Sequence, residues 1–378
     1  MLDFCNAQDA TQLLPERLNA CASAPYVASV VRLATRDSVY PMQSERRQHT
    51  SYVIRALIAV VLLVCALLLL RNLARVDFDQ AINSLSSIPI SRATAVLGFA
   101  AGSYACLTCF DWLGLKYAGH PLLYRQAALA SFTALSLGHN IGFAALSSGA
   151  VRYRFYSRWG LSPVDVGKLI VFCGVTVGLG LVTLGGMALL LMPRLSGEVI
   201  GTGPGVARIF GSLCLSAPIA YVAAAFCEVR LKVRRWSLAL PTPRLALAQV
   251  LLGTLNFALV AACLHQALSA FADVRYPAVV AVYVLANSAA IASHVPGGLG
   301  VIESAVLFLL PGTASLAAVI AFRIAYFLLP LPFGLSALFI AELVHSKRAR
   351  RMKNNFPSIE AESRDQRGRW IKQPSAKH

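Results

Sequence analysis

The chain has 378 residues, of which 57% are hydrophobic and only 13% are charged, and its formal net charge is +17. This composition leaves no room for a soluble catalytic domain, and continuously apolar runs exclude an outer-membrane barrel, whose strands alternate with period two. Because the basic residues lie in loops and tails between apolar segments, the charge favours membrane orientation and anionic lipid over nucleic acid. We therefore predict an all-α integral membrane protein.

Three regions follow one another along the chain. Residues 1–50 are polar, begin without the apolar core of a signal peptide, and are predicted to be a disordered leader. Residues 51–346 are predicted to form the membrane domain, and 347–378 a basic, disordered cytoplasmic tail. Within the membrane domain, apolar segments occupy 53–70, 93–115, 126–148, 168–192, 206–227, 244–268, 277–293, 299–311 and 313–343.

Two topologies fit these segments: about eight simple spans, or six spans with two re-entrant hairpins. If 126–148 spans the membrane, the basic residues before it and those after it lie on opposite sides. The N-terminus, with Arg46, Arg47 and Arg55, then faces outside, which conflicts with the positive-inside rule. If 126–148 and 277–311 are instead opposed hairpins, every basic cluster and both termini become cytoplasmic. We prefer this second topology, because opposed broken elements are also typical of inverted repeats with a binding site near the midplane. The basic clusters are Arg152/Arg154/Arg158/Lys168, Arg230/Lys232/Arg234/Arg235/Arg244 and Lys347/Arg348/Arg350/Arg351/Lys353.

The first hairpin contains the polar stretch Ser136-Leu-Gly-His-Asn-Ile-Gly142. We expect the backbone to break near Gly138–Gly142, with His139 and Asn140 forming the break. Such backbone is tolerated at membrane depth only where protein buries it or where it lines a watery cavity. These two side chains either satisfy the freed backbone groups or bind a polar group that crosses the bilayer.

The second hairpin contains Ser293-His-Val-Pro-Gly-Gly-Leu-Gly300, followed by Glu303. Gly297 and Gly298 permit positive φ and close backbone approach, and the next helix presents free N–H groups that suit a phosphate. Glu303 either complements the helix dipole or holds a cationic head-group amine. Together with His294, these residues predict a lipid head-group site at the second break.

Charged side chains inside apolar segments need partners. Arg323 is expected to face the protein interior, with Glu303 or a lipid phosphate as its partner, and Asp111 likewise needs an ion pair or water. Asn256 and Asn287 are interpreted as interhelical hydrogen bonders. The run from Arg152 through Arg154 to Trp159 predicts an interfacial anchor, or alternatively a gate that gathers anionic head groups.

Small residues in the apolar segments predict packing, not cofactor chemistry. The fourth segment contains Gly174, Gly178, Gly180, Gly185 and Gly186, which indicate close helix packing because no strand precedes them. The nine cysteines form no framework, and the CxxC pair Cys106 and Cys109 has no partner ligands in sequence. We predict no metal site and no cofactor, and HExxH, GxSxG and Walker A motifs are missing from the sequence.

Three motifs in order resemble the transmembrane region of bacterial lysylphosphatidylglycerol synthases, the family that includes the multiple peptide resistance factor. They are Leu137-Gly-His-Asn-Ile-Gly-Phe143, Ser148-Gly-Ala-Val-Arg-Tyr-Arg-Phe-Tyr-Ser157 and His294-Val-Pro-Gly-Gly-Leu-Gly-Val-Ile-Glu303. The likeness covers about residues 51–346. It implies a membrane part that flips aminoacylated phosphatidylglycerol, without the C-terminal synthase domain of the full-length proteins.

The functional prediction is therefore a phospholipid translocase of the bacterial inner membrane, not an enzyme, with a cytoplasmic C-terminus. Its partners would be membrane phospholipids of the phosphatidylglycerol type, aminoacylated or not, and no nucleic acid. Two alternatives are a membrane subunit for a separately encoded synthase, and an intramembrane enzyme of the phosphatidylglycerol lysyltransferase type. The expected head-group site, with no catalytic residues, comprises His139, Asn140, Arg152, Arg154, His294, Gly297, Gly298, Glu303 and Arg323.

Overall fold

A computed structural model describes residues 88–141, 144–194, 197, 201–227, 230–233, 236–293, 296–310 and 316–355. All of them belong to one compact unit, Leu62–His378. The predicted leader, the first predicted span at 53–70, His294 and residues 356–378 lie outside the described residues. The helices are α4 (Ile90–Tyr117), α5 (Tyr124–Ile141), α6 (Ala144–Tyr156), η1 (Ser157–Trp159), α7 (Pro163–Leu191), α9 (Pro204–Phe226), α10 (Pro243–Leu268), α11 (Tyr276–Ser293), η2 (Pro296–Gly298), α12 (Val301–Leu309), α13 (Leu316–Arg323), η3 (Ile324–Leu328) and α14 (Pro330–Asn355).

The predicted all-α membrane bundle is confirmed. Among the described residues, six helices are long and apolar enough to cross a membrane. Five of them match predicted spans, and the sixth is α11, which we had expected to be the first arm of the second hairpin. The last span runs without interruption from α13 through the π-helical turn η3 into α14, which continues beyond the predicted end of the membrane domain to Asn355.

The described loops add little regular structure to the bundle. Between α9 and α10, the predicted basic loop forms a short antiparallel pair, β1 (Arg230–Val233) and β2 (Trp236–Ala239), with Val233 opposite Trp236. Proline occupies the first turn of α7, α9 and α10, where its missing N–H has no intrahelical partner to lose. Ser162 caps α7, because its hydroxyl oxygen accepts a hydrogen bond of 3.2 Å from the Asp165 N–H.

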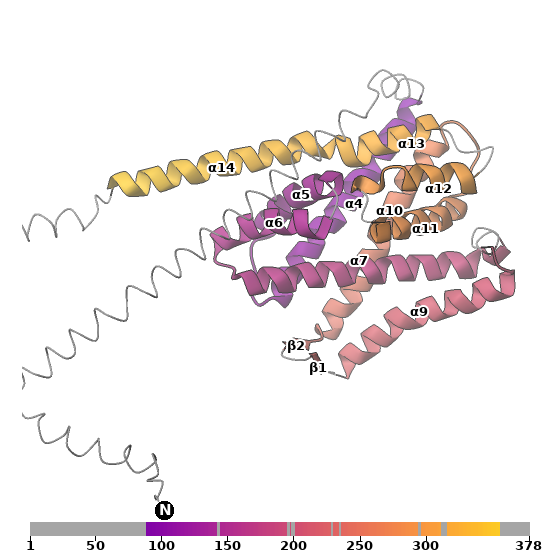
Figure 1. Cartoon of the computed structure of the whole chain (residues 1–378), viewed down its shortest axis with the longest axis horizontal. Helices are drawn as coiled ribbons and strands as arrows, with labels where there is room; N and C mark the ends of the chain where they lie inside the picture. The colour runs from indigo at the N-terminus through magenta and orange to yellow at the C-terminus, as the bar shows by residue number, and fades with distance from the viewer. Residues whose placement is uncertain are drawn as a thin grey trace, which may run out of the picture. The chain divides into compact units, whose positions relative to one another are not determined.

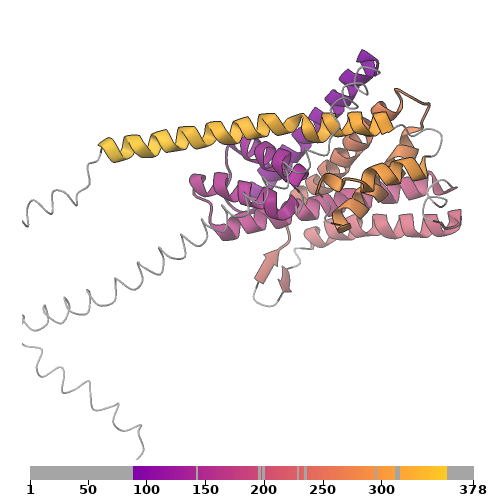
Figure 2. The same ribbon diagram turned by 45° about the horizontal axis from the view of Figure 1, so that its top comes forward.

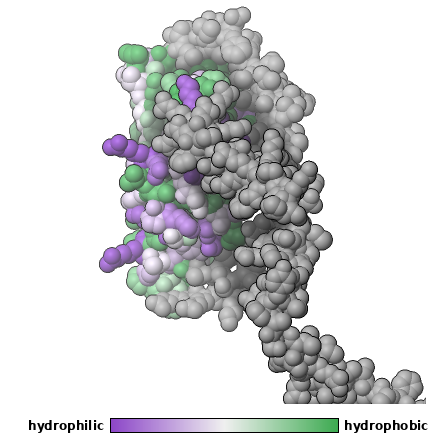
Figure 3. Space-filling view, turned by 90° about the vertical axis from the view of Figure 1, so that its left-hand side faces the viewer, coloured by the Kyte–Doolittle hydropathy of each residue, from purple (hydrophilic) through white to green (hydrophobic). Residues whose placement is uncertain are grey.

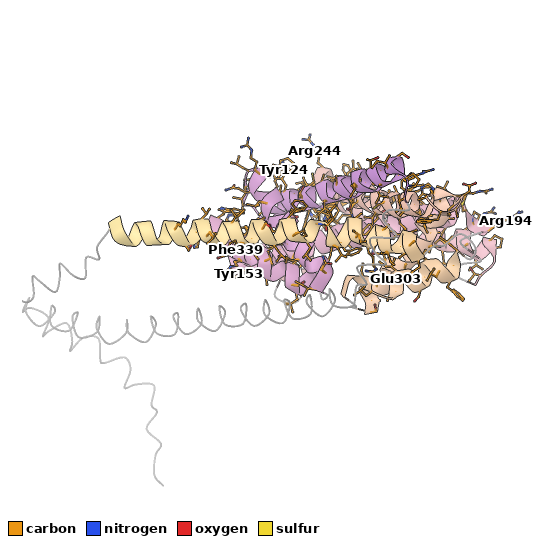
Figure 4. The ribbon with its side chains drawn as sticks, turned by 90° about the horizontal axis from the view of Figure 1, so that it is seen from above. Tyr124, Tyr153, Arg194, Arg244, Glu303 and Phe339 are labelled. Atoms are coloured by element: carbon orange, nitrogen blue, oxygen red, sulfur yellow. The ribbon has the colours of Figure 1, made fainter. Side chains whose placement is uncertain are left out.

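Both predicted hairpins exist as pairs of packed helices. Helix α5 packs against α6, and α11 packs against α12. The α5–α6 pair enters the bundle from the end that carries Tyr124 and Tyr153, and the α11–α12 pair enters from the end that carries Arg194 (Figures 1 and 4). The turned view shows the same two helix pairs (Figure 2), and the end of the first pair contacts the second through α5 and η2.

The first helix of this hairpin ends at Ile141, within the Gly138–Gly142 stretch where the break is expected. His139 and Asn140 do not form the break, because α5 remains helical through Ile141. The reason is local: the Asn140 Nδ2 donates a hydrogen bond of 2.8 Å to the Ser136 carbonyl one turn earlier. This bond stabilises the last turn of the helix, so both side chains project from a helix end and not from a loop.

Hydrophilic side chains gather at one end of the bundle, where α6 ends and α7 begins (Figure 3). Three of the predicted cytoplasmic bases, Arg152, Arg154 and Lys168, lie on these two helices. The opposite end, where α7 ends and α9 begins, carries Arg194 and Arg208.

Glycine packing holds α7 against its neighbours. A Cβ on Gly180 would lie 2.3 Å from the Gly253 carbonyl carbon of α10, and one on Gly186 would lie 3.1 Å from the Gly211 carbonyl oxygen of α9. The predicted close packing is thus confirmed at Gly180 and Gly186. At Gly174 and Gly178 a Cβ would meet none of the described residues within 4 Å, so the structure shows no close packing there.

Gly180→Ala is expected to lower the free energy of unfolding by about 1–3 kcal/mol, because the backbones of α7 and α10 would have to separate. Thermal unfolding of the detergent-purified protein measures the effect. Gly178→Ala on the same helix is the control, and its greater helix propensity should leave stability unchanged or raise it by about 0.5–1 kcal/mol. Equal melting temperatures for the two variants would contradict the packing argument.

Candidate functional site

The two hairpin tips contact each other through backbone. A Cβ on Gly297 would lie 3.2 Å from the His139 carbonyl oxygen, so only glycine allows the tips to approach this closely. Gly297, Gly298 and Gly300 have φ values of 58°, 60° and 80°, a region that side chains disfavour. The glycines of the second motif therefore shape a turn that fits against the end of α5.

Arg323 and Glu303 form an ion pair beside this contact. The Arg323 Nη2 donates to the Glu303 Oε2 at 2.7 Å, and its Nε donates to the Glu303 Oε1. Both side chains are largely buried, with 12% and 18% of their surfaces exposed. Of the two partners predicted for Arg323, the structure places Glu303 against it. Glu303 lies between the ends of the bundle that Tyr153 and Arg194 mark (Figure 4).

The same guanidinium also holds the glycine turn. Arg323 donates to the Gly297 carbonyl oxygen at 3.0 Å and to the Gly298 carbonyl oxygen at 2.9 Å. The Glu303 Oε2 in turn accepts a hydrogen bond of 2.8 Å from the Gly300 N–H, which caps α12. One arginine thus joins the π-helical region of the last span to the second hairpin. We call Gly297, Gly298, Glu303 and Arg323 the tip cluster.

His139 faces aromatic rings instead of water. Its ring stacks on Tyr326 with a centroid distance of 6.0 Å, and the edges of Tyr104 and Phe327 pack around it at 6.1 Å each. Its Nδ1 is buried and has no hydrogen-bond partner among the described residues. Because an unsatisfied buried polar atom costs roughly 1–3 kcal/mol, this nitrogen is the group at the hairpin contact most in need of a polar ligand.

Asn140 and Tyr104 satisfy backbone that the last span leaves irregular. Pro330 lacks the N–H that would bond the Tyr326 carbonyl in an α-helix, and the Tyr104 hydroxyl donates to that carbonyl at 3.2 Å. The Asn140 Nδ2 donates to the Phe327 carbonyl at 2.8 Å. Asn140 therefore bonds a backbone carbonyl of η3 and not, as one reading expected, the freed groups of its own bend.

A further polar group lies beside these residues and was not found from sequence. The Ser103 hydroxyl of α4 is 2.7 Å from the Asn256 Oδ1 of α10 and 2.9 Å from the Tyr326 hydroxyl. Asn256 is thus an interhelical hydrogen bonder, as predicted. A serine and two tyrosines in apolar helices give too weak a signal, because these residue types also pack in ordinary cores. We call Ser103, Tyr104, His139, Asn140, Asn256 and Tyr326 the central polar cluster.

The Arg152 side chain is bound by other side chains of the protein. Its guanidinium binds both carboxylate oxygens of Asp111, at 2.8 and 2.9 Å, and donates to the Ser148 hydroxyl at 2.9 Å. The Tyr156 hydroxyl also donates to Asp111, at 2.8 Å. With 5% of Arg152 and none of Asp111 exposed, this is the structural ion pair foreseen for Asp111, and it joins α4 to α6.

Arg154 lies at the rim of the basic end. It forms a two-point pair with Glu342 of α14, at 2.6 and 2.8 Å, and Arg158 binds the same carboxylate. Arg154 and Arg158 carry two positive charges and Glu342 carries one negative charge, so these three side chains have a net positive charge. Trp159 packs against Phe155 and Tyr156 nearby, an arrangement suited to a membrane interface.

Within the described ranges, no three His, Cys, Asp or Glu side chains converge in a way that could hold a metal ion. The tip cluster and the central polar cluster lie next to each other, since Gly297 approaches both the His139 carbonyl and the Arg323 guanidinium. Of the expected site residues, the structure brings together His139, Asn140, Gly297, Gly298, Glu303 and Arg323. It gives Arg152 and Arg154 separate partners on α4 and α14.

No family model matches the chain. It is 29% identical over 299 residues to the uncharacterised protein slr0712 of Synechocystis sp. (strain ATCC 27184 / PCC 6803 / Kazusa), a match that covers 74% of this chain and 89% of that protein. It is 27% identical over 276 residues to the inner membrane protein YbhN of Escherichia coli (strain K12), covering 71% and 86%. Together with the six apolar helices, these relatives support a multi-pass inner-membrane protein.

Proposed function

We propose that this protein moves a phospholipid head group across the inner membrane along the contact between its two hairpins. The observation that carries the proposal is a set of charged and polar groups held where opposed hairpin tips meet inside an apolar bundle. Irregular backbone and ionisable groups at such depth are costly and usually mark a substrate path. The resemblance to the lysylphosphatidylglycerol synthase membrane region points to the same function.

The tip cluster suggests how a head group would be bound. Arg323 and Glu303 neutralise each other, and separating them would leave two uncompensated charges in a largely buried setting, which costs several kcal/mol. A head group that carries both a phosphate and an ammonium would compensate both, with the phosphate on Arg323 and the amine on Glu303. This exchange favours aminoacylated phosphatidylglycerol over a lipid with only negative charge.

The rim residues would collect the lipid. The surplus positive charge of Arg154 and Arg158 with Glu342 would attract anionic head groups from the leaflet at the basic end of the bundle. We assign that end to the cytoplasm by the positive-inside rule, so the C-terminus is proposed to be cytoplasmic. In this route Arg152 is a positioning residue, because its pair with Asp111 holds α6 against α4.

His139→Ala is expected to slow translocation about tenfold or more, because it removes the polar atom that would bond the passing head group. The measurement is leaflet exchange of fluorescent phosphatidylglycerol and lysylphosphatidylglycerol in liposomes that contain the purified protein. His120→Ala is the control, since His120 pairs with Asp165 at the start of α7, away from the tips. Wild-type rates for His139→Ala would remove His139 from the route, and no exchange by the wild-type protein would refute the proposed function.

A further inference from the structure

A groove on the side of the bundle lies apart from both polar clusters. It has a volume of about 360 Å³ and is lined by Phe99 of α4, Tyr276 of α11 and the face of α10 from Ala258 to Gln266. The volume falls in the range of small-molecule sites, which are roughly 300–1,000 Å³. Its walls are fixed by hydrogen bonds, because the Tyr276 hydroxyl donates to the Ala258 carbonyl at 2.9 Å and the His265 Nε2 lies 2.9 Å from the Val274 carbonyl.

The groove changes character along its length. Its inner part is formed by Ala258, Leu259 and Ala262, whereas His265 and Gln266 follow one turn later, near the last residue of α10. Arg92, in the first turn of α4, donates to the Gln266 Oε1 at 2.6 Å. The polar rim therefore lies at the end of the bundle where α10 ends and α4 begins, and the apolar part extends from there towards the middle.

Arg92 is one of several described arginines that form no ion pair with another described residue, and it lies at the polar rim of this groove through its bond to Gln266. Arg152, Arg154, Arg158 and Arg323 are each paired with a carboxylate, but Arg92 has no ion pair among the described residues. A guanidinium has five N–H donors, and the bond to Gln266 uses one of them. An apolar channel that ends at an uncompensated cation is complementary to an acyl chain attached to a phosphate.

We propose that this groove binds one anionic phospholipid, with an acyl chain against Leu259 and Ala262 and its phosphate on Arg92. The site requires no transport, so it stands or falls independently of the proposed translocation.

The test measures retained lipid by native mass spectrometry after the full-length protein is titrated with phosphatidylglycerol or phosphatidylcholine in detergent. The wild-type protein should retain phosphatidylglycerol preferentially. Ala262→Trp fills the groove and should lower the retained phosphatidylglycerol at least twofold. Arg92→Gln should lower the preference for phosphatidylglycerol over phosphatidylcholine about tenfold, because a charge-assisted hydrogen bond is lost.

Two further variants keep the result decisive. Gln266→Glu preserves volume and places a carboxylate on Arg92, so it should also lower the phosphatidylglycerol preference even if Ala262→Trp fails to fold. Leu213→Trp on the exposed face of α9 controls for adding a tryptophan to a lipid-facing helix, and should retain lipid as the wild type does. Unchanged preference in both Arg92→Gln and Gln266→Glu would overturn the proposal, as would unchanged retention in a folded Ala262→Trp protein.

Discussion

Asp111→Ala is expected to destabilise the protein by about 3–5 kcal/mol, the cost of leaving one member of a buried ion pair without its partner. Asp111 is fully buried and accepts hydrogen bonds from Arg152 and from the Tyr156 hydroxyl. Its loss would strand a guanidinium between α4 and α6. The measurement is thermal unfolding of the detergent-purified variant against the wild type.

Two comparisons test the cause of this loss. Asp165→Ala removes a carboxylate whose partners at the start of α7, Lys168 and His120, are exposed, and its cost should stay well below that of Asp111→Ala. A double variant, Asp111→Leu with Arg152→Met, removes both charges and should recover much of the stability lost by Asp111→Ala. If the double variant is as unstable as the single one, the uncompensated charge is not the reason.

Glu303→Gln is expected to slow the translocation of lysylphosphatidylglycerol by about a hundredfold, equivalent to roughly 2.7 kcal/mol. The substitution keeps the volume and an oxygen that can accept from the Gly300 N–H, but it removes the charge proposed to bind the amine. Phosphatidylglycerol has no amine, so its translocation should fall less. The ratio of the two rates in the liposome assay is therefore the sharper readout.

Glu342→Gln is the matched control, because Glu342 also pairs with arginines but lies at the rim, where its side chain is 32% exposed. It leaves the tip cluster intact, so it should change the rate ratio much less than Glu303→Gln does. Arg323→Lys retains the charge but not the planar fork that binds Glu303 and the carbonyls of Gly297 and Gly298, so both lipids should slow. An unchanged rate ratio in Glu303→Gln would show that Glu303 only closes the turn.

The positions of the basic residues and the interruptions in the apolar segments predicted much of this fold. Continuous apolar runs indicate helices at membrane depth, and two glycine-bearing interruptions marked both hairpins. Arg323 and Asp111 were recognised as needing partners because an isolated charge in an apolar helix is costly. His139 and Asn140 were wrongly assigned to the break itself, because the sequence does not reveal that α5 stays helical through Ile141.

Most of the side-chain contacts between helices could not be predicted from the sequence. Arg152 and Arg154 are two positions apart and were expected to act together, yet one is buried against Asp111 and the other reaches Glu342 at the rim. Their separate partners follow from the helical rotation between them, which turns them towards α4 and α14. Ser103, Tyr104 and Tyr326 were missed because their partners lie on other helices: Ser103 meets Asn256 and the Tyr326 hydroxyl, and Tyr104 meets the Tyr326 carbonyl.

The sequence by itself determined the membrane class, the two interruptions and the asymmetry of charge, since hydrophobicity and charge act locally along the chain. Only the tertiary structure decided that the hairpin tips meet, that Arg323 closes the glycine turn through Glu303, and that His139 faces aromatic rings with a nitrogen that none of the described residues bonds. The contacts of these clusters join residues up to 223 positions apart, as in the hydrogen bond between Ser103 and Tyr326. Packing of whole helices, and not any local pattern, fixes them.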